Sequence, residues 1–392
     1  MKLYDLLDKE KLDHHIREGF VSVTQHPSQP LIIFNYTPRA AFAGAWGDGT
    51  LDYCRGLIVN QHSEEIVARP FKKFHNLNTQ SMPETMAENL PPSRPEITQK
   101  MDGSLGIWYD DGTPEGAIAT RGSFTSPQAL WATKWWKKQF IGPWLASPAI
   151  WREYWTPLFE IIYPENRVVV DYGGYAGLTC IGGVYIETGL DVSRWELEKV
   201  FGSHVVEKAY ARTKRGKFRL DHPLTLAACA KQNIPNEEGY VASYDQGRLR
   251  VKIKFADYVK LHRIITGVNP RSLWELLSTN EEFDKTGLPA NFVAWAEKWE
   301  NYLWNEFNRI QTEAVELFGD RPFREAGETE RYYRAKFARF VMAQTKDRDY
   351  LKPVLFDMFD GYDGNRVIWR MLEPAGNDMR FSTSGIDATE GE

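Results

Sequence analysis

The chain has 392 residues, of which 42% are hydrophobic and 14% aromatic, and its net charge is −5. This composition is typical of a packed protein of two or more domains and excludes a disordered or membrane-embedded chain, because no apolar run approaches the ~20 residues of a membrane span. The acidic balance does not indicate a nucleic-acid binder, although an enzyme needs only a local basic track. The N-terminus lacks a signal-peptide core and the three cysteines are far apart, so we expect a cytoplasmic protein with free thiols.

The first predicted elements form a β-rich region over residues 31–255, where apolar runs end at Gly, Asp or Pro turns. Two features interrupt the strands. Residues 109–116 predict a hairpin connection. The tryptophan-rich residues 131–155 predict a helix that packs into a core, with an RNA-stacking surface as the alternative. The predicted strands are 31–36, 54–60, 64–71, 104–109, 116–122, 158–163, 166–172, 179–186, 238–243 and 248–255.

After this region the apolar residues recur three and four positions apart, which predicts helices, the first of them with a capped start. A boundary near residues 257–266 divides the chain into a β-rich domain, residues 1–260, and a helical domain, residues 261–375. The polar tail, residues 376–392, is expected to be disordered. The predicted fold class is therefore α+β, with a mixed or antiparallel β domain followed by an all-helical C-terminal domain. The predicted helices after the boundary are 269–278, 291–319, 330–344 and 351–363.

The motif KMDGS places Lys100 at the end of a predicted strand, directly before a turn. Such a lysine is a candidate covalent nucleophile, because its neutral amine attacks when neighbouring cations or metal ions favour that form. Asp102 would face the same side as Lys100 on a strand, and Gly103 permits the turn and a close approach of substrate to the backbone. The alternative is an ordinary Asp-Gly turn with a solvated lysine.

Residues 248–255 predict a strand with one apolar face and one cationic face, which carries Arg248, Arg250, Lys252 and Lys254. Basic residues two positions apart point the same way and are suited to hold a phosphate chain. The alternative is an edge strand that positive charge protects from aggregation.

Three other charged residues lie within or beside predicted strands. Glu160 is inside an apolar run, where a buried carboxylate needs a metal ion, a substrate hydroxyl or a basic side chain as its partner. Glu238 precedes a glycine and a strand, and Arg55 is at the head of another strand. The sequence has no Walker-type loop, HExxH, GxSxG or GxGxxG motif, which argues against P-loop ATPases, zinc proteases and α/β-hydrolases.

In chain order, these motifs resemble those of the covalent nucleotidyltransferases, which comprise ATP-dependent ligases and capping enzymes. KMDGS resembles their nucleophile motif, and LFEII resembles motif III or IIIa. EEGYVA resembles motif IV, and RVKIKF resembles motif V. With YCRGLIV and ARPFKKFHNLN, they resemble the phage-type ATP-dependent RNA ligase 1 family over the β-rich part of the chain. The helical C-terminal pattern favours the same family, because DNA ligases and capping enzymes continue into an OB-fold of short strands.

The resemblance implies catalytic roles for five residues. Lys100 would attack the α-phosphate of ATP, release pyrophosphate and carry AMP on its nitrogen. Lys252 and Lys254 would hold the α-phosphate, and Asp102 would stay near the nucleophile and metal-bound waters. Glu238 would bind the metal ion, Mg²⁺ or Mn²⁺, through oxygen ligands.

Nucleotide-binding roles follow from the resemblance in the same way. Arg55 would orient AMP or the RNA 5'-phosphate, and Glu160 would bind the ribose or the metal. Lys73, with Lys72 as the neighbouring alternative, matches a lysine that contacts the outer phosphates. Arg121 stands where relatives often have a lysine, which leaves its role open. The further nucleotide-contact candidates are Tyr36 and Tyr258.

The function implied is an ATP-dependent RNA ligase that joins RNA 5'-phosphate and 3'-hydroxyl ends in single-stranded or nicked-loop RNA, through a lysyl-AMP enzyme and an adenylylated RNA 5' end. The resemblance also implies RNA repair, such as tRNA repair, a bacteriophage source, the host cytoplasm and a monomer. The basic residues within 207–222 offer a phosphate-binding loop, against the default of a solvated loop. Two alternatives stay open: a DNA ligase or capping-type enzyme, and a non-catalytic nucleic-acid binding module, which the presence of the motif lysines disfavours.

Overall fold

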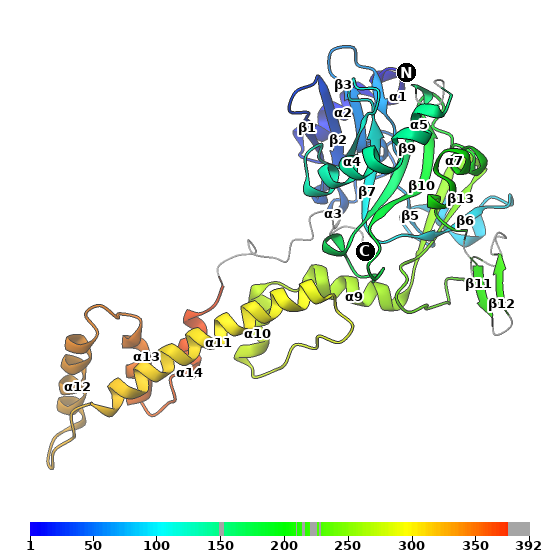
Figure 1. The fold of residues 1–392 in the computed structure, drawn as a ribbon. Helices are drawn as coiled ribbons and strands as arrows, with labels where there is room; N and C mark the ends of the chain where they lie inside the picture. The colour runs from blue at the N-terminus through cyan, green and yellow to red at the C-terminus, as the bar shows by residue number, and fades with distance from the viewer. Residues whose placement is uncertain (149–152, 209, 214–215, 220–225, 227–228, 375–392) are drawn as a thin grey trace. The chain divides into compact units, whose positions relative to one another are not determined.

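The computed structural model divides the chain into two compact units, an N-terminal unit over Met1–Thr266 and a C-terminal unit that begins at Gly267. The structure describes residues 1–148, 153–208, 210–213, 216–219, 226 and 229–374. The strands lie in the N-terminal unit, and the regular elements described after Gly267 are all helices (Figure 1). The α+β prediction with a helical C-terminal region is therefore confirmed. The predicted disordered tail lies outside the described residues.

Three four-stranded sheets and one hairpin make up the described strands, and the pairing is antiparallel except between β14 and β5. The first sheet has the order β1 (Val21–Gln25), β2 (Leu31–Tyr36), β3 (Arg55–Asn60), β4 (Ile66–Ala68). The second has the order β10 (Gly177–Tyr185), β9 (Trp155–Ile162), β7 (Ser104–Tyr109), β8 (Ala117–Thr120). The third has the order β5 (His75–Asn76), β14 (Leu249–Lys254), β13 (Gly239–Tyr244), β6 (Glu96–Lys100). The hairpin pairs β11 (Tyr210–Thr213) with β12 (Gly216–Arg219).

The helices follow the sequence pattern closely in the C-terminal unit. The predicted cap is present at the start of α10, where the Asn269 side chain accepts from the N–H groups of Arg271 and Ser272. None of the described helices is both long and apolar enough to cross a membrane. The helices up to the boundary are α1 (Leu3–Leu6), α2 (Lys9–Arg17), α3 (Pro38–Phe42), α4 (Pro127–Gln139), α5 (Ile141–Ala146), α7 (Arg194–Phe201) and α9 (Ala256–Gly267). Those after it are α10 (Pro270–Ser278), α11 (Ala290–Gly319), α12 (Glu330–Gln344), α13 (Leu351–Phe359) and α14 (Asn365–Met371).

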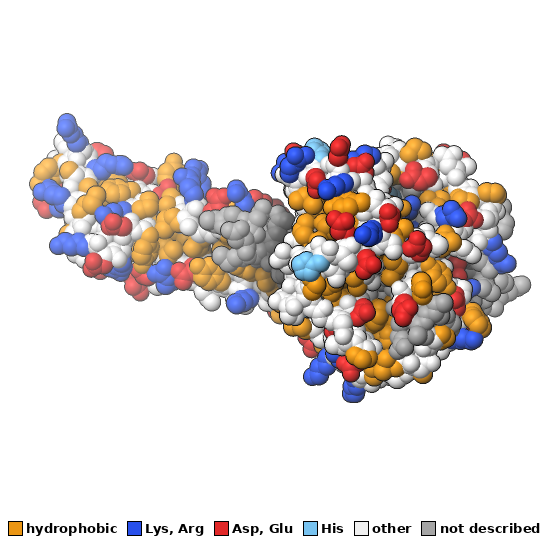
Figure 2. Space-filling view, turned by 90° about the horizontal axis from the view of Figure 1, so that it is seen from above, with side chains coloured by type: hydrophobic (Ala, Val, Ile, Leu, Met, Phe, Trp, Pro, Cys, Tyr) orange, Lys and Arg blue, Asp and Glu red, His pale blue; other side chains and the backbone are white. Residues whose placement is uncertain are grey.

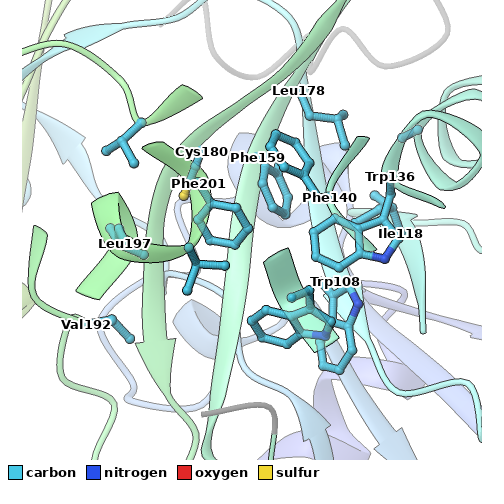
Figure 3. Packing of buried hydrophobic residues seen from close by; sticks show 14 of the residues in the cluster. Trp108, Ile118, Trp136, Phe140, Phe159, Leu178, Cys180, Val192, Leu197 and Phe201 are labelled. Atoms are coloured by element: carbon cyan, nitrogen blue, oxygen red, sulfur yellow. The ribbon is translucent and has the colours of Figure 1, made fainter. Parts of the chain in front are cut away.

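The core of the N-terminal unit explains the tryptophan-rich stretch. Helix α4 packs on β8 and β10, and α7 packs on β10. Their buried rings lie together with those of the sheet, including Trp136, Phe140, Phe159 and Phe201 (Figure 3). The predicted packed face is confirmed. The helical prediction over 131–155 is interrupted where α5 stops at Ala146, holds again at Glu153 and Tyr154, and is wrong at Trp155, which begins β9.

The predicted strand over 166–172 is also wrong. This segment follows a short 3₁₀ turn and pairs with none of the described strands. The N–H groups of Val169 and Val170 instead donate to the Asp102 carboxylate, at 2.8 and 2.7 Å. A side chain therefore satisfies the backbone donors that a sheet would otherwise pair.

Charged side chains of both signs are spread over the surface. On the face in Figure 2, basic and acidic groups lie interspersed among apolar ones over the described parts of both units. The backbone of the basic segment 207–222 contributes β11 and β12, but most of its side chains lie outside the described residues.

Candidate active site

A pocket of about 750 Å³ lies within the N-terminal unit. One part of its lining is apolar and includes Ile181, Val192, Leu197, Val206 and Val241. Another part is polar and carries most of the sequence-predicted site residues. The predicted residues that line the pocket are Arg55, Lys100, Asp102, Arg121, Glu160, Glu238 and Tyr258.

Lys100 ends β6 and forms an ion pair at the pocket wall. Its Nζ lies 2.7 Å from Glu238 Oε1, and the Nζ of Lys254 lies 3.6 Å from the same oxygen. The exposed fractions of the Lys100, Glu238 and Lys254 side chains are 14%, 1% and 6%. One buried carboxylate therefore stands between two lysines, which offsets the cost of burying their charges.

Strand register brings these three side chains together. Gly239 pairs with Lys100 on β6 and with Lys254 on β14, so Glu238 directly precedes the residue that faces both lysines. Gly239 has a φ of +147°, and a Cβ there would lie 1.9 Å from the Ile253 carbonyl oxygen. Only glycine fits this position, which explains the Glu-Gly pair in the motif.

Asp102 is buried and its carboxylate is held by protein donors. Besides the N–H groups of Val169 and Val170, the Tyr258 hydroxyl donates to Oδ1 at 2.8 Å. The Asp102 N–H in turn donates to the Tyr172 hydroxyl at 2.7 Å, and burial followed by the Asp102 charge raises the pKa of Tyr172. Tyr258, a predicted nucleotide contact, is thus bonded to Asp102 in this structure.

Gly103 completes the turn after Lys100 for a reason that differs from the sequence expectation. A Cβ at Gly103 would lie 2.6 Å from the Ile161 carbonyl oxygen on β9. The close approach is therefore to a neighbouring strand, which packs the turn against the residue that follows Glu160.

Arg55 and Glu160 face the pocket from different sheets. Arg55 begins β3, and its guanidinium lies 5.6 Å from the centre of the Phe74 ring. Its Nη1 is buried without a hydrogen-bond partner among the described residues. Glu160 lies on β9 opposite Leu105 and Thr179 and is half-buried. An anion is the natural partner for the buried guanidinium nitrogen.

Tyr36, Lys73 and Arg121 form a second cationic group. The buried Tyr36 hydroxyl accepts from Lys73 Nζ at 3.2 Å and from Arg121 Nη1 at 2.9 Å. Both cations also lie 4.8 Å from the centre of the Tyr36 ring. Lys73 is half-buried, whereas its neighbour Lys72 is exposed. Of this group, Arg121 lines the pocket and the other two lie outside its lining.

Lys252 is buried on β14 but, like Lys254, does not line the pocket itself. Its Nζ lies 6.0 Å from the centre of the Phe74 ring. His75, one strand away, has its pKa lowered to about 4 by burial first and then by the charges of Lys73 and Lys252. His75 is therefore neutral at physiological pH.

Sequence reasoning missed Asp191, which holds the cationic strand β14 in place through Arg250. The Nη2 of Arg250 donates to both carboxylate oxygens of Asp191. The Arg250 guanidinium also lies 3.8 Å from the centre of the Phe71 ring. The Ser243 hydroxyl donates to Asp191 at 2.9 Å. These contacts tie β13 and β14 to the turn after β10. No sequence motif marks Asp191, because its partner is 59 residues away.

The carboxylates of the pocket are too few to hold a divalent cation by themselves and would need a substrate phosphate as a further ligand. The described residues contain no group of three or more His, Cys, Asp or Glu side chains that could hold a metal ion. Glu160 and Glu238 both line the pocket, however, and Mg²⁺ binds through one or two carboxylates, substrate phosphates and retained waters. Those two carboxylates would hold the ion, which would neutralise phosphate charge.

Comparisons with known proteins show the family to which this chain is similar. The family model described as RNA ligase matches residues 53–258. A protein of Thermovibrio ammonificans named "Putative RNA ligase" is 24% identical over 245 residues, covering 59% of each chain. "Uncharacterized protein ORF64" of Ostreid herpesvirus 1 is 28% identical over 172 residues, covering 43% of this chain and 41% of that protein.

An archaeal ATP-dependent RNA ligase is a solved structure with 13% identity and a TM-score of 0.43, covering 92% of this chain and 84% of that one. The chain spans about half the length of the two sequence relatives above. The family match alone covers more than half of the 392 residues and includes Arg55, Lys100, Glu160, Glu238 and both β14 lysines. The chain therefore belongs to the RNA ligase family.

Proposed function

We propose that this protein is an ATP-dependent RNA ligase that joins RNA 5'-phosphate and 3'-hydroxyl ends. The observation that carries the proposal is the ion-paired group of Lys100, Glu238 and Lys254, of which Lys100 and Glu238 line the pocket of about 750 Å³. A lysine at the end of a strand, with further cations beside it, suits transfer of a nucleotidyl group through a covalent intermediate. Family membership supports the same reaction.

The first step forms a lysyl-AMP enzyme. The lone pair of the neutral Lys100 amine forms a bond to the α-phosphorus of ATP. The bond from that phosphorus to the bridging oxygen breaks, and pyrophosphate leaves with the electron pair. The ion pair with Glu238 holds Lys100 as an ammonium, so this contact must open and the proton must leave before attack.

Two further transfers complete the reaction. An oxygen of the RNA 5'-phosphate attacks the phosphorus of lysyl-AMP. The P–N bond breaks, and the Lys100 nitrogen keeps the electron pair, takes a proton from water and leaves as the amine. The RNA 3'-hydroxyl then attacks the 5'-phosphorus, loses its proton and expels AMP. Such transfers depend on positioning and charge neutralisation more than on acid–base chemistry.

The remaining residues divide between phosphate binding and support. Lys252 and Lys254 hold the α-phosphate, and Arg55 orients AMP or the RNA 5'-phosphate. Lys73 contacts the outer phosphates. Asp102 supports the turn after the nucleophile through its bonds to the chain, in addition to any contact with metal-bound water. The apolar part of the pocket is suited to the adenine base.

The biological role that we propose is RNA repair, with a broken tRNA loop as one substrate. The RNA would be single-stranded or nicked within a loop, and the enzyme would act as a monomer in the cytoplasm. These assignments rest on the resemblance and on family membership.

The test is labelling of the protein by ATP that is radioactive at the α-phosphate, with Mg²⁺, for wild type and Lys100→Ala. We expect an acid-labile label on wild type and none on the variant, because a phosphoramidate forms only on the amine. Absence of label from both ATP and GTP would overturn the proposal. Labelling by ATP followed by sealing of DNA but not RNA would favour a DNA ligase.

A further inference from the structure

We infer that Trp46 is a positioning residue for Lys73, and that it acts in adenylylation of the enzyme but not in sealing of adenylylated RNA. The inference rests on the proposed function, since it uses the outer phosphates of ATP. It concerns a loop between α3 and β3 that none of the sequence motifs includes.

The Lys73 ammonium lies beside two aromatic rings that contact each other. Its Nζ is 4.9 Å from the centre of the Trp46 ring and 4.8 Å from that of Tyr36. The two rings meet edge to face, with their centres 4.9 Å apart. Lys73 makes no ion pair with the carboxylates of the described residues. Rings attract a cation without neutralising its charge, so the ammonium stays able to bind an anion.

The loop that carries Trp46 is anchored two residues later, at Asp48, by polar contacts. Asp48 accepts from the Thr50 and Leu51 N–H groups at 2.9 and 3.0 Å. Its other oxygen lies 2.6 Å from Nε2 of the buried His15 on α2. The ring of Trp46 also packs against a buried hydrophobic cluster. The loop thus presents the ring to Lys73 from a fixed position.

This arrangement predicts an effect on one step of the reaction. The outer phosphates are present only while ATP reacts with Lys100, and they leave as pyrophosphate. Adenylylated RNA lacks them, so sealing of that substrate does not need Lys73 to be held in place. Loss of the Trp46 ring should therefore weaken ATP binding for the first step alone.

The experiment compares wild type, Trp46→Phe and Trp46→Leu in two assays. Label transfer from ATP is measured over a range of ATP concentrations, and sealing of pre-adenylylated RNA is measured without ATP. We expect Trp46→Leu to raise the KM for ATP about 5- to 30-fold, Trp46→Phe to raise it less, and sealing to change less than twofold.

A second comparison tests whether Trp46 acts through Lys73. In a Lys73→Ala background, Trp46→Leu should raise the KM no further, because the partner is already missing. Trp195→Leu is the matched control, since Lys199 Nζ lies 3.6 Å from the centre of the exposed Trp195 ring, outside the pocket lining. We expect this control to leave the KM unchanged.

The outcomes separate this inference from the proposed function. An unchanged KM in Trp46→Leu, an equal rise in the Lys73→Ala background, or an equal loss of sealing overturns the inference while the proposed ligase function stands. A folded wild-type protein that takes no label overturns both. The Trp46→Phe variant keeps a ring in the loop and tests for a graded KM response, and sealing that changes less than twofold in the same variants excludes a general folding defect.

Discussion

Two cationic groups of the N-terminal unit hold their charges in different ways. Lys100 and Lys254 share the buried carboxylate of Glu238. Lys73 instead lies beside the rings of Tyr36 and Trp46. The first arrangement neutralises charge and stabilises buried lysines, whereas the second keeps the charge available for a ligand. Under the proposed function, the first group would have to rearrange before Lys100 reacts, whereas the second could bind a phosphate as it stands.

The largest expected effect is on the free energy of unfolding, which should differ between substitutions in the two cationic groups. Glu238→Ala removes the acidic partner of two buried lysines and should lower the free energy of unfolding by about 3 kcal/mol. Lys73→Ala breaks no ion pair of the described residues and should lower it by less than about 1 kcal/mol. Urea denaturation of both variants measures the difference.

A surface pair provides the control for that measurement. Glu115 and Lys137 lie 2.9 Å apart with both side chains well exposed. Glu115→Ala should change the free energy of unfolding by less than about 0.5 kcal/mol. If Glu238→Ala is no more destabilising than Glu115→Ala, the buried carboxylate does not stabilise the lysines.

An intermediate effect sharpens the role of the second group. Lys73→Ala should raise the KM for ATP in label transfer about tenfold, because the charged hydrogen bond to phosphate that we propose for Lys73 would be lost. Lys72→Ala should change it less than twofold, since that side chain is exposed. Equal effects of the two substitutions would show that the rings do not select between neighbouring lysines.

The smallest effect concerns pH. The pKa of His75 is about 4 in the folded chain and about 6.5 when unfolded, so acid favours the unfolded state between these values. Stability from His75 is present above pH 6.5 and is lost as the pH falls toward 4. The loss between pH 7 and 5 should be about 1 kcal/mol smaller in His75→Asn, after discounting for partial exposure. Identical losses in urea denaturation would contradict this.

Much of the fold was predictable because its signals are local. Helix α11 ends at Gly319 where the sequence pattern places the end, and β6 ends at Lys100 as expected. The segment 166–172 was not predictable, because its apolar pattern is that of a strand while its N–H groups bind Asp102, which is 67 and 68 residues away from them.

The site was predictable where residues belong to motifs. Lys100, Glu238 and Lys254 each belong to a motif, although the strand register that brings them together is known only from the structure. Trp46 and Asp191 had no such signal, because each acts on a distant residue from a loop. Contacts of this kind depend on the tertiary packing of sheets and loops, which the periodicity of a short stretch of sequence does not predict.

The Asp102 carboxylate has a consequence for how the irregular segment exchanges with solvent. Amides that donate to a buried acceptor exchange with solvent only when that hydrogen bond opens. The N–H groups of Val169 and Val170 should therefore exchange only when the turn after Lys100, which carries Asp102, also opens. A segment without regular structure is thereby joined to the turn after Lys100 in one cooperative unit. A substitution that destabilises either the turn after Lys100 or the segment 166–172 should therefore speed amide exchange in the other.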